Sequence, residues 1–154
     1  MLKYSDFKKL KFPRLSFILG FGGLIPFVFC AVIIIFDINF LFDPTKILLY
    51  YGAVILSFVG AISWGFATKE QTGNKLQQYM FLCSIFPALI AFVALLISQT
   101  ISFLFLILGF LLAYMVEKKI EYKLDIPSWY MYLRLRLTLI VSICLCVGLI
   151  QDVF

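Results

Sequence analysis

Residues 79–116 read YMFLCSIFPALIAFVALLISQTISFLFLILGFLLAYMV, and this stretch contains no charged residue. A helix needs about 20 predominantly apolar residues to cross the roughly 30 Å hydrocarbon core of a bilayer. The stretch is too long for one crossing, and its polar residues gather at Ser98-Gln99-Thr100. We therefore predict two membrane-spanning helices, over about 79–97 and 101–116, joined by a tight turn.

The rest of the chain has the same character. Apolar residues make up 64% of the 154 residues and charged residues only 14%, whereas soluble domains contain about 45–50% and about 25%. Three further apolar runs are long enough to cross the bilayer, and they cover about 15–36, 44–67 and 128–149. The sequence thus predicts an all-α integral membrane protein, a bundle of five transmembrane helices that forms a single membrane domain over 1–154.

Two of the predicted spans contain residues that bend helices. The first span holds the cluster Gly22, Gly23 and Pro26 near its start, and the third holds Pro87. Proline removes a backbone hydrogen bond inside a helix, and in a membrane the freed carbonyl needs another partner. We expect a bend or break in the first span and a kink at Pro87, where Ser84 is a candidate partner for the freed carbonyl.

The distribution of basic residues predicts the orientation of the bundle. Of the 13 Lys and Arg residues, all but Lys46 fall on one side of the membrane if the N-terminus is cytoplasmic. Short cytoplasmic segments carry an excess of Lys and Arg. We therefore predict a cytoplasmic N-terminus and a periplasmic C-terminus in a bacterial inner membrane, with the mitochondrial inner membrane as the alternative.

The same pattern excludes several classes of function. The net charge is +5, but the basic residues flank apolar runs, where they serve topology or contact anionic lipid, so we expect no nucleic-acid partner. Histidine is absent and the four cysteines lie inside apolar runs, which removes the usual zinc and haem ligand sets. No carboxylate enters the body of a predicted span. We expect no metal, no cofactor, no disulfide and no enzymatic activity.

Small residues in the second span predict a helix-packing face. Such residues let helix backbones approach closely in a membrane. The predicted packing residues are Gly52, Ala53, Ser57, Gly60, Ala61 and Gly65. An alternative reading makes Ser57, Ser63 and Trp64 the lining of a path for a small molecule or an ion.

The start of the fifth span is a second candidate region. Its polar and aromatic residues, a candidate lipid site, are Trp129, Tyr132, Arg134, Arg136 and Thr138. Arg134 lies about 9 Å along the helix from Ser128, close enough for its side chain to reach the membrane surface. Arg134 and Arg136 point in different directions, however, so one of them can face the bundle or hold a lipid phosphate. Both readings remain open at this point.

Three stretches resemble a known family. They are Leu19-Gly20-Phe21-Gly22-Gly23-Leu24-Ile25-Pro26-Phe27, the run from Tyr51 to Phe66, and the group of Trp129-Tyr130, Leu133-Arg134 and Leu137-Thr138. Together they resemble the membrane family called domain of unknown function 3429, or transmembrane protein 69-like. The resemblance implies a multi-span protein of a bacterial inner membrane or of mitochondria, and it implies no particular activity.

These observations support two hypotheses about function. The first is an accessory or assembly component of the inner membrane that acts by interaction, either as a homo-oligomer or with another membrane protein. The alternative is a transporter or ligand-binding membrane protein, because broken helices line substrate sites in transporters. The lipid bilayer is the expected environment, and anionic phospholipid is a candidate partner. A structure with no cavity between the first, second and fifth spans would rule the alternative out.

Overall fold

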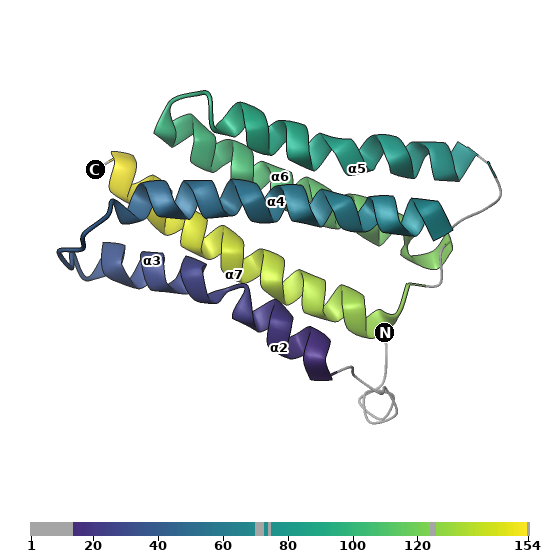
Figure 1. The fold of residues 1–154 in the computed structure, drawn as a ribbon, viewed down its shortest axis with the longest axis horizontal. Coiled ribbons are helices and arrows are strands. Elements are labelled where there is room, and N and C mark those ends of the chain that lie inside the picture. The colour runs from purple at the N-terminus through teal and green to yellow at the C-terminus, as the bar shows by residue number, and fades with distance from the viewer. Residues whose placement is uncertain (1–13, 70–72, 74, 124–125, 154) are drawn as a thin grey trace.

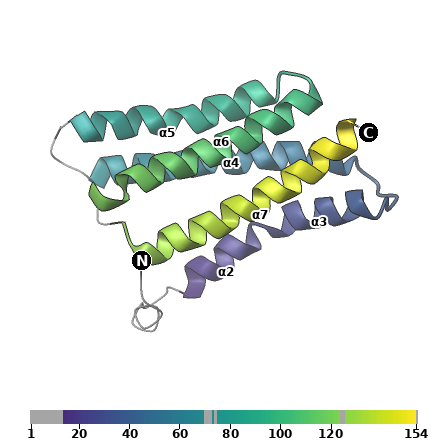
Figure 2. The ribbon, with the colours of Figure 1, turned by 180° about the vertical axis from the view of Figure 1, so that it is seen from behind.

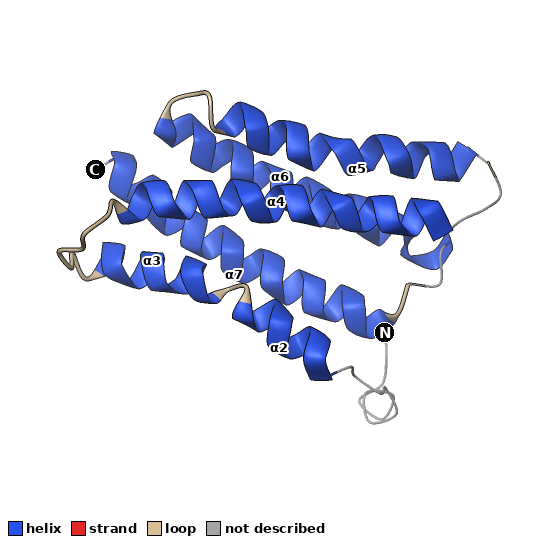
Figure 3. Cartoon of the chain, viewed as in Figure 1, coloured by secondary structure: helices blue, strands red, loops and turns tan. Residues whose placement is uncertain are grey.

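The computed structural model describes residues 14–69, 73, 75–123 and 126–153, and within these ranges every regular element is a helix (Figure 3). In chain order they are α2 (Arg14–Gly22), α3 (Ile25–Ile35), α4 (Pro44–Lys69), α5 (Lys75–Ala94), α6 (Gln99–Ile120), the 3₁₀ helix η1 (Glu121–Lys123) and α7 (Ser128–Val153). With α2 and α3 counted together, five of the described segments are long and apolar enough to cross a bilayer. The predicted five-span, all-α fold is confirmed.

The helices extend beyond several of the predicted spans. Helix α5 starts at Lys75 rather than at residue 79, and α6 continues to Ile120 rather than ending at 116. Gln99 already belongs to α6, and Ser98 is its extended N-cap residue, with φ −61° and ψ 147°. The differences arise because hydropathy marks the apolar part of a helix, whereas backbone hydrogen bonding continues through the polar residues beyond it.

Consecutive spans run antiparallel, and α4 and α7 lie between the others (Figures 1 and 2). Helix α4 contacts α3, α5, α6 and α7, while α7 contacts α2, α3, α4 and α6. This arrangement places the starts of α2, α5 and α7 and the ends of α4 and α6 at one end of the bundle. We call it the basic end, because it carries Arg14, Lys69, Lys75, Lys118, Lys119 and Lys123. Lys3, Lys8, Lys9 and Lys11 lie outside the described residues.

The first span is broken where its glycines and proline occur. Helix α2 ends at Gly22, α3 begins at Ile25, and Pro26 lies in the first turn of α3. The hydroxyl of Tyr51 on α4 donates a hydrogen bond to the carbonyl of Gly23, at 3.0 Å. This bond satisfies a carbonyl of the break and fixes the break against α4.

Helix α4 approaches α5 closely at Gly60. A Cβ atom at this position would lie 2.5 Å from the carbonyl oxygen of Ser84 and 3.2 Å from Cβ of Pro87. Only glycine allows this approach of the two backbones. The hydroxyl of Ser84 donates to the carbonyl of Phe81, at 2.7 Å, and not to the carbonyl of Cys83 that Pro87 frees, so the predicted role of Ser84 was wrong.

Asp43 caps the start of α4, where Pro44 is the first helical residue. Oδ1 of Asp43 accepts hydrogen bonds from the backbone N–H groups of Thr45, at 3.0 Å, and Lys46, at 3.3 Å. Partial burial raises the pKa of the Asp43 carboxyl, but the hydrogen bonds from Thr45 and Lys46 outweigh it and hold the pKa below its usual value. A charged carboxylate at this position satisfies the first free N–H groups of the helix.

Candidate ligand-binding site

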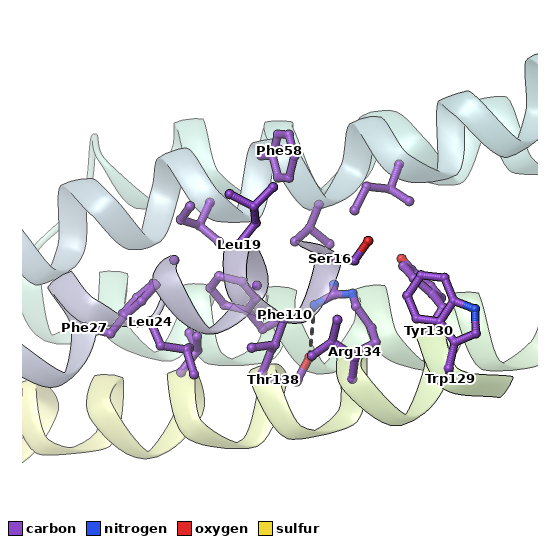
Figure 4. A pocket seen from close by; sticks show the side chains of 18 residues that line it. Ser16, Leu19, Leu24, Phe27, Phe58, Phe110, Trp129, Tyr130, Arg134 and Thr138 are labelled. Atoms are coloured by element: carbon purple, nitrogen blue, oxygen red, sulfur yellow. Dashed lines mark hydrogen bonds between the residues drawn. The ribbon is translucent and has the colours of Figure 1, made fainter. Parts of the chain in front are cut away.

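A cavity of about 500 Å³ lies between the broken first span, α4 and α7. Phe110 of α6 contributes to its wall, and Figure 4 shows the lining side chains. Cavities of about 300–1,000 Å³ are typical of sites for small molecules. The broken first span, α4 and α7 are the first, second and fifth spans. The cavity therefore lies where the ligand-binding hypothesis requires one.

The lining is apolar over most of its length and polar at one end. In Figure 4, Leu24 and Phe27 lie at one end, while Ser16, Tyr130 and Arg134 gather toward the other. The remaining described lining residues are Leu19, Gly20, Gly23, Ile55, Phe58, Val59, Ile62, Phe110, Trp129, Leu133, Leu137, Thr138 and Val141. The polar end is the one nearer the basic end of the bundle, because Tyr130 and Arg134 lie near the start of α7.

The cavity opens sideways between α2 and α4. Leu19 on α2 and Phe58 on α4 both line it, yet they are 66% and 65% exposed. The break after Gly22 sends α2 along α7 and away from α4 (Figures 1 and 2). Both residues belong to apolar spans, so the opening lies on a surface that hydrocarbon would cover in a membrane.

An ion pair is buried beside the polar end of the cavity. Nε of Arg134 donates to Oε2 of Glu117 on α6, at 2.9 Å, and Nη1 donates to the hydroxyl of Thr138, at 3.2 Å. Arg134 is 6% exposed and Glu117 only 1%. Removing two charges from water is costly, and close pairing compensates for that cost. The pair therefore links the start of α7 to the end of α6 at the same level along the bundle axis.

Tyr130 lies beside this ion pair and interacts with both of its members. Nη2 of Arg134, the Tyr130 hydroxyl and Oε1 of Glu117 have almost no accessible surface, and the Tyr130 hydroxyl lies within hydrogen-bonding range of both charged side chains. Buried polar groups normally find a hydrogen-bond partner. Arg134 and Tyr130 line the cavity, whereas Glu117 is not among its lining residues. The polar groups of the ion pair and of Tyr130 are thus enclosed with one another beside the cavity, and the side chains of Arg134 and Tyr130 form part of its wall.

Glu117 corrects two of the sequence-based predictions. A carboxylate does enter the body of a span, because Glu117 is buried within α6. Arg134 does not extend to the surface, because Glu117 compensates its charge inside the bundle. The pair could have been inferred from the sequence, because its two residues are equally far from the turn between the helices. Glu117 lies eight residues before residue 125, and Arg134 lies eight residues after residue 126. A short turn between antiparallel helices places such positions at equal heights.

The other residues predicted at the start of α7 do not all face the cavity. Arg136 is exposed, with its guanidinium carbon 4.1 Å from the ring centroid of Tyr132, and it donates a hydrogen bond to the Tyr132 hydroxyl. Trp129 lines the cavity and packs against Phe17 of α2, with ring centroids 6.4 Å apart. The structure therefore brings Trp129, Arg134 and Thr138 together and places Arg136 outside.

The path predicted along α4 does not coincide with the cavity. Ser57, Ser63 and Trp64 are absent from its described lining, whose α4 wall consists of Ile55, Phe58, Val59 and Ile62. Ser57 donates to the carbonyl of Ala53, at 2.9 Å. Ser63 is buried, while the exposed Trp64 packs edge-on against Phe81, with ring centroids 4.8 Å apart. The predicted residues lie beside the observed ones along α4 but on other faces of the helix.

The predicted small-residue face of α4 is divided between two surfaces. Gly52, Ala53 and Gly60 are buried against neighbouring helices, whereas Ala61 and Gly65 are exposed. The buried face instead continues through Val59, Ser63 and Ala67, none of which belongs to the predicted packing set. The four-residue spacing drifts around a helix with 3.6 residues per turn, which explains the divergence.

Within the described residues, no group of three or more Cys, Asp or Glu side chains is arranged to hold a metal ion. Cys30 and Cys144 are buried free thiols, while Cys83 is partly and Cys146 largely exposed. The chemical character of the site therefore comes from the guanidinium and hydroxyl groups at the polar end of the cavity.

Five apolar helical segments around a core of aliphatic and aromatic side chains define a polytopic membrane protein. The chain belongs to the family described as protein of unknown function (DUF3429), whose sequence profile matches residues 12–150. The resemblance predicted from the sequence motifs is thereby confirmed.

Two relatives extend this result. Transmembrane protein 69 of Xenopus tropicalis is 34% identical over 157 residues, which cover 99% of this chain and 60% of the frog protein. Transmembrane protein 69 of Mus musculus is 26% identical over 140 residues, which cover 91% of this chain and 57% of the mouse protein. The chain thus spans less than two thirds of the length of these relatives. No solved structure is significantly similar to it.

Proposed function

We propose that this membrane protein binds a small apolar molecule or a lipid in the cavity between its first, second and fifth spans. The observation that carries the proposal is an apolar chamber of about 500 Å³ that has the side chains of Ser16, Tyr130 and Arg134 toward one end. Such a site can hold an apolar body and orient it through a few polar contacts. On this proposal the protein is a ligand binder or carrier and not an enzyme.

The position of the opening supports a ligand that arrives through the bilayer. The cavity opens between Leu19 and Phe58, on apolar spans. A polar solute from water would have to cross hydrocarbon to reach this opening, at a cost that rises with each polar group it carries. A molecule dissolved in the membrane reaches it by lateral diffusion.

Blocking the cavity tests the proposal. Val59 lines the cavity from α4, and Val54 lies on the exposed surface of the same helix. We expect Val59→Phe to fill the chamber and remove the small molecule or lipid that co-purifies in mild detergent. Val54→Phe, which adds the same volume outside the cavity, is expected to retain it.

Native mass spectrometry of both variants and of the unaltered protein measures the retained molecule. Equal retention in all three, or retention of nothing in any of them when purified from native membranes, would contradict binding in this cavity.

A role as an interaction component is the second candidate. Ala61 and Gly65 are exposed on α4, and a Cβ atom at Gly65 would meet nothing within 4 Å. Small residues on an open face allow another helix to approach, from a second copy or from another membrane protein. Gly65→Leu should then lower the yield of a cross-linked complex in native membranes, whereas an unchanged yield would argue against this face.

We also propose that the basic end faces the cytoplasm, or the matrix in a mitochondrial relative, and that the membrane is an inner membrane. All but one of the 13 basic residues support this orientation through the excess of Lys and Arg on the inner side. A phosphatase reporter fused after Phe154 should be active in the periplasm of a bacterial host. A reporter that is active only in the cytoplasm would reverse the orientation.

A further inference from the structure

We propose that the occupant of the cavity is a bilayer phospholipid from the leaflet at the basic end, an inference that rests on the proposed function. One acyl chain of this lipid enters the cavity between α2 and α4, while its phosphate group lies outside the cavity, at Arg14 and Lys69. A diacyl phospholipid is therefore the ligand class, in preference to a small apolar molecule that lacks a phosphate.

The depth of the cavity matches one leaflet of a bilayer. On α7 the described lining begins at Trp129 and reaches Val141, which lies at the middle of that helix. These twelve residues, at 1.5 Å each, extend about 18 Å along the helix axis. One leaflet contributes about 15 Å, half of the roughly 30 Å hydrocarbon core. The described lining thus extends from the basic end to about the middle of the bundle, as an acyl chain of that leaflet does.

Aromatic rings close the deep end of the cavity. Phe27 of α3 is fully buried, and its ring packs against Tyr51, with centroids 4.9 Å apart, and edge-on against Phe110, with centroids 6.4 Å apart. Phe27 and Phe110 both belong to the lining. A chain that enters from the side therefore ends at these rings, near the level at which the acyl chains of one leaflet end.

The walls suit a hydrocarbon chain and exclude a charged group. The polar groups of Arg134 and Tyr130 are enclosed beside Glu117, so the surface left to an occupant is predominantly apolar. An acyl chain brings no polar group into such a chamber, whereas a buried phosphate would lose its hydration without compensation. The head group of the lipid therefore remains outside, where the cavity opens.

Two basic residues flank the opening at the basic end. Arg14 is the first residue of α2 and lies two residues before the lining residue Ser16. Lys69 is the last residue of α4 and lies seven residues after the lining residue Ile62. Both are exposed, and neither forms an ion pair with a described residue. Because Lys and Arg near a membrane surface attract anionic lipid, the two helices that border the opening also supply charges complementary to a phosphate.

The two tryptophans of the chain provide one reporter in the cavity and one outside it. Trp129 lines the cavity, and Trp64 is absent from its described lining, so Trp64→Phe and Trp129→Phe each leave one reporter. Bromine quenches tryptophan fluorescence at short range. The probes are phosphatidylglycerol with 6,7-dibromostearoyl chains, its 11,12-dibromo isomer, the diacylglycerol with 6,7-dibromostearoyl chains, and a dibromoalkane. Each is added to the delipidated protein in detergent.

In the Trp64→Phe protein, we expect brominated phosphatidylglycerol to quench Trp129 in a saturable way, with one lipid bound per protein. The 6,7-dibromo isomer should quench more strongly than the 11,12-dibromo isomer, because Trp129 lies at the end of the cavity nearer the head group. The diacylglycerol should require an about thirtyfold higher concentration, because it lacks the phosphate that the two basic residues attract. Trp64 in the Trp129→Phe protein should show no saturable quenching.

One pair of variants tests the place of the acyl chain. Val59→Phe fills the cavity from α4 and should abolish saturable quenching of Trp129 by every probe. Val54→Phe adds the same volume on the exposed surface of that helix and should preserve the quenching.

A second pair of variants tests the place of the head group. Arg14→Gln/Lys69→Gln should raise the concentration of phosphatidylglycerol that quenches Trp129 by about thirtyfold and leave quenching by the dibromoalkane unchanged. Lys119→Gln/Lys123→Gln removes the same charge from exposed residues of α6 and η1 at the basic end. This control should have little effect, because it leaves the two residues at the opening intact.

The outcomes distinguish the phospholipid inference from the proposed function. Saturable quenching by the dibromoalkane but not by phosphatidylglycerol would overturn the inference and leave the ligand cavity standing. Equal binding of the diacylglycerol and phosphatidylglycerol, stronger quenching by the 11,12-dibromo isomer, or an unchanged affinity in Arg14→Gln/Lys69→Gln would overturn it as well. If no probe quenches Trp129 more strongly in the Val54→Phe protein than in the Val59→Phe protein, the proposed function itself fails.

Discussion

Helix α4 meets α5 and the first span in opposite ways. At Gly60 its backbone approaches that of α5 so closely that a Cβ atom would lie 2.5 Å from the carbonyl oxygen of Ser84. On the side facing α2, the same helix borders a cavity of about 500 Å³. The comparison teaches that the bundle is not uniformly packed: one interface of α4 fixes the fold, and the other leaves room for a ligand.

The largest expected effect comes from the ion pair beside the open interface. Arg134→Met leaves the carboxylate of Glu117 buried without its partner, and such a loss costs about 3–5 kcal/mol of unfolding free energy. The double variant Arg134→Met/Glu117→Leu should recover most of that loss, because no uncompensated charge remains. Thermal unfolding in detergent measures both, and a double variant as unstable as the single one would contradict the charge explanation.

The closed interface is tested by two glycines of the same helix. Gly60→Ala forces the backbones of α4 and α5 apart and should destabilise the protein by about 1–3 kcal/mol. Gly65→Ala meets nothing within 4 Å and should stabilise it by about 0.5–1 kcal/mol, since alanine is the better helix former. Equal effects of both substitutions would show that the closeness at Gly60 is not what holds the interface.

A smaller effect is expected where α4 contacts the break in the first span. Tyr51→Phe removes the hydrogen bond to the carbonyl of Gly23, and interhelical hydrogen bonds in membranes contribute on average about 0.6 kcal/mol. Its exposed neighbour Tyr50 provides the control Tyr50→Phe, which should leave the unfolding free energy unchanged. Hydrogen exchange at residues 20–25 should increase in the first variant alone.

The smallest effect concerns the cap of α4 and depends on pH. The pKa of Asp43 is held below its ordinary value of 3.8 in the folded protein. Its contribution to stability is therefore present above that value and is lost as the pH falls through the lower, folded pKa. Asp43→Asn keeps a capping oxygen and should remove this acid-sensitive part of the stability. A melting curve of the variant that keeps the full pH dependence below pH 4 would contradict the assignment.

The sequence was sufficient for the elements that depend on local composition. The five spans, the break near Gly22 and the cap at Asp43 all follow from apolar length or from residues within one turn of each other. The cavity depends instead on the direction in which α2, before the break, departs from α4, and no local pattern encodes that direction. Its α4 wall is apolar, at Ile55, Phe58, Val59 and Ile62, so nothing marked it as a site.

Glu117 shows a second reason why the site could not be predicted from the sequence. It precedes Lys118 and Lys119, and in a hydropathy profile such a residue belongs to the charged segment outside the membrane. Its burial depends on Arg134, 17 residues away in the sequence. Arg134 was recognised as a candidate, but its position inside the bundle could be inferred only after a partner at the same height was considered.

The ion pair also has a consequence for biogenesis. A charged residue inside a membrane helix adds to the cost of insertion, by as much as about 2.5–3.5 kcal/mol at the centre of the span, and α6 and α7 each contain one partner of the Glu117–Arg134 pair near one end. Because only a short segment joins the two helices, the hairpin can enter the bilayer with its charges already paired. We expect α6 and α7 to leave the translocon together, and a long polar insertion between them to delay or divert that step.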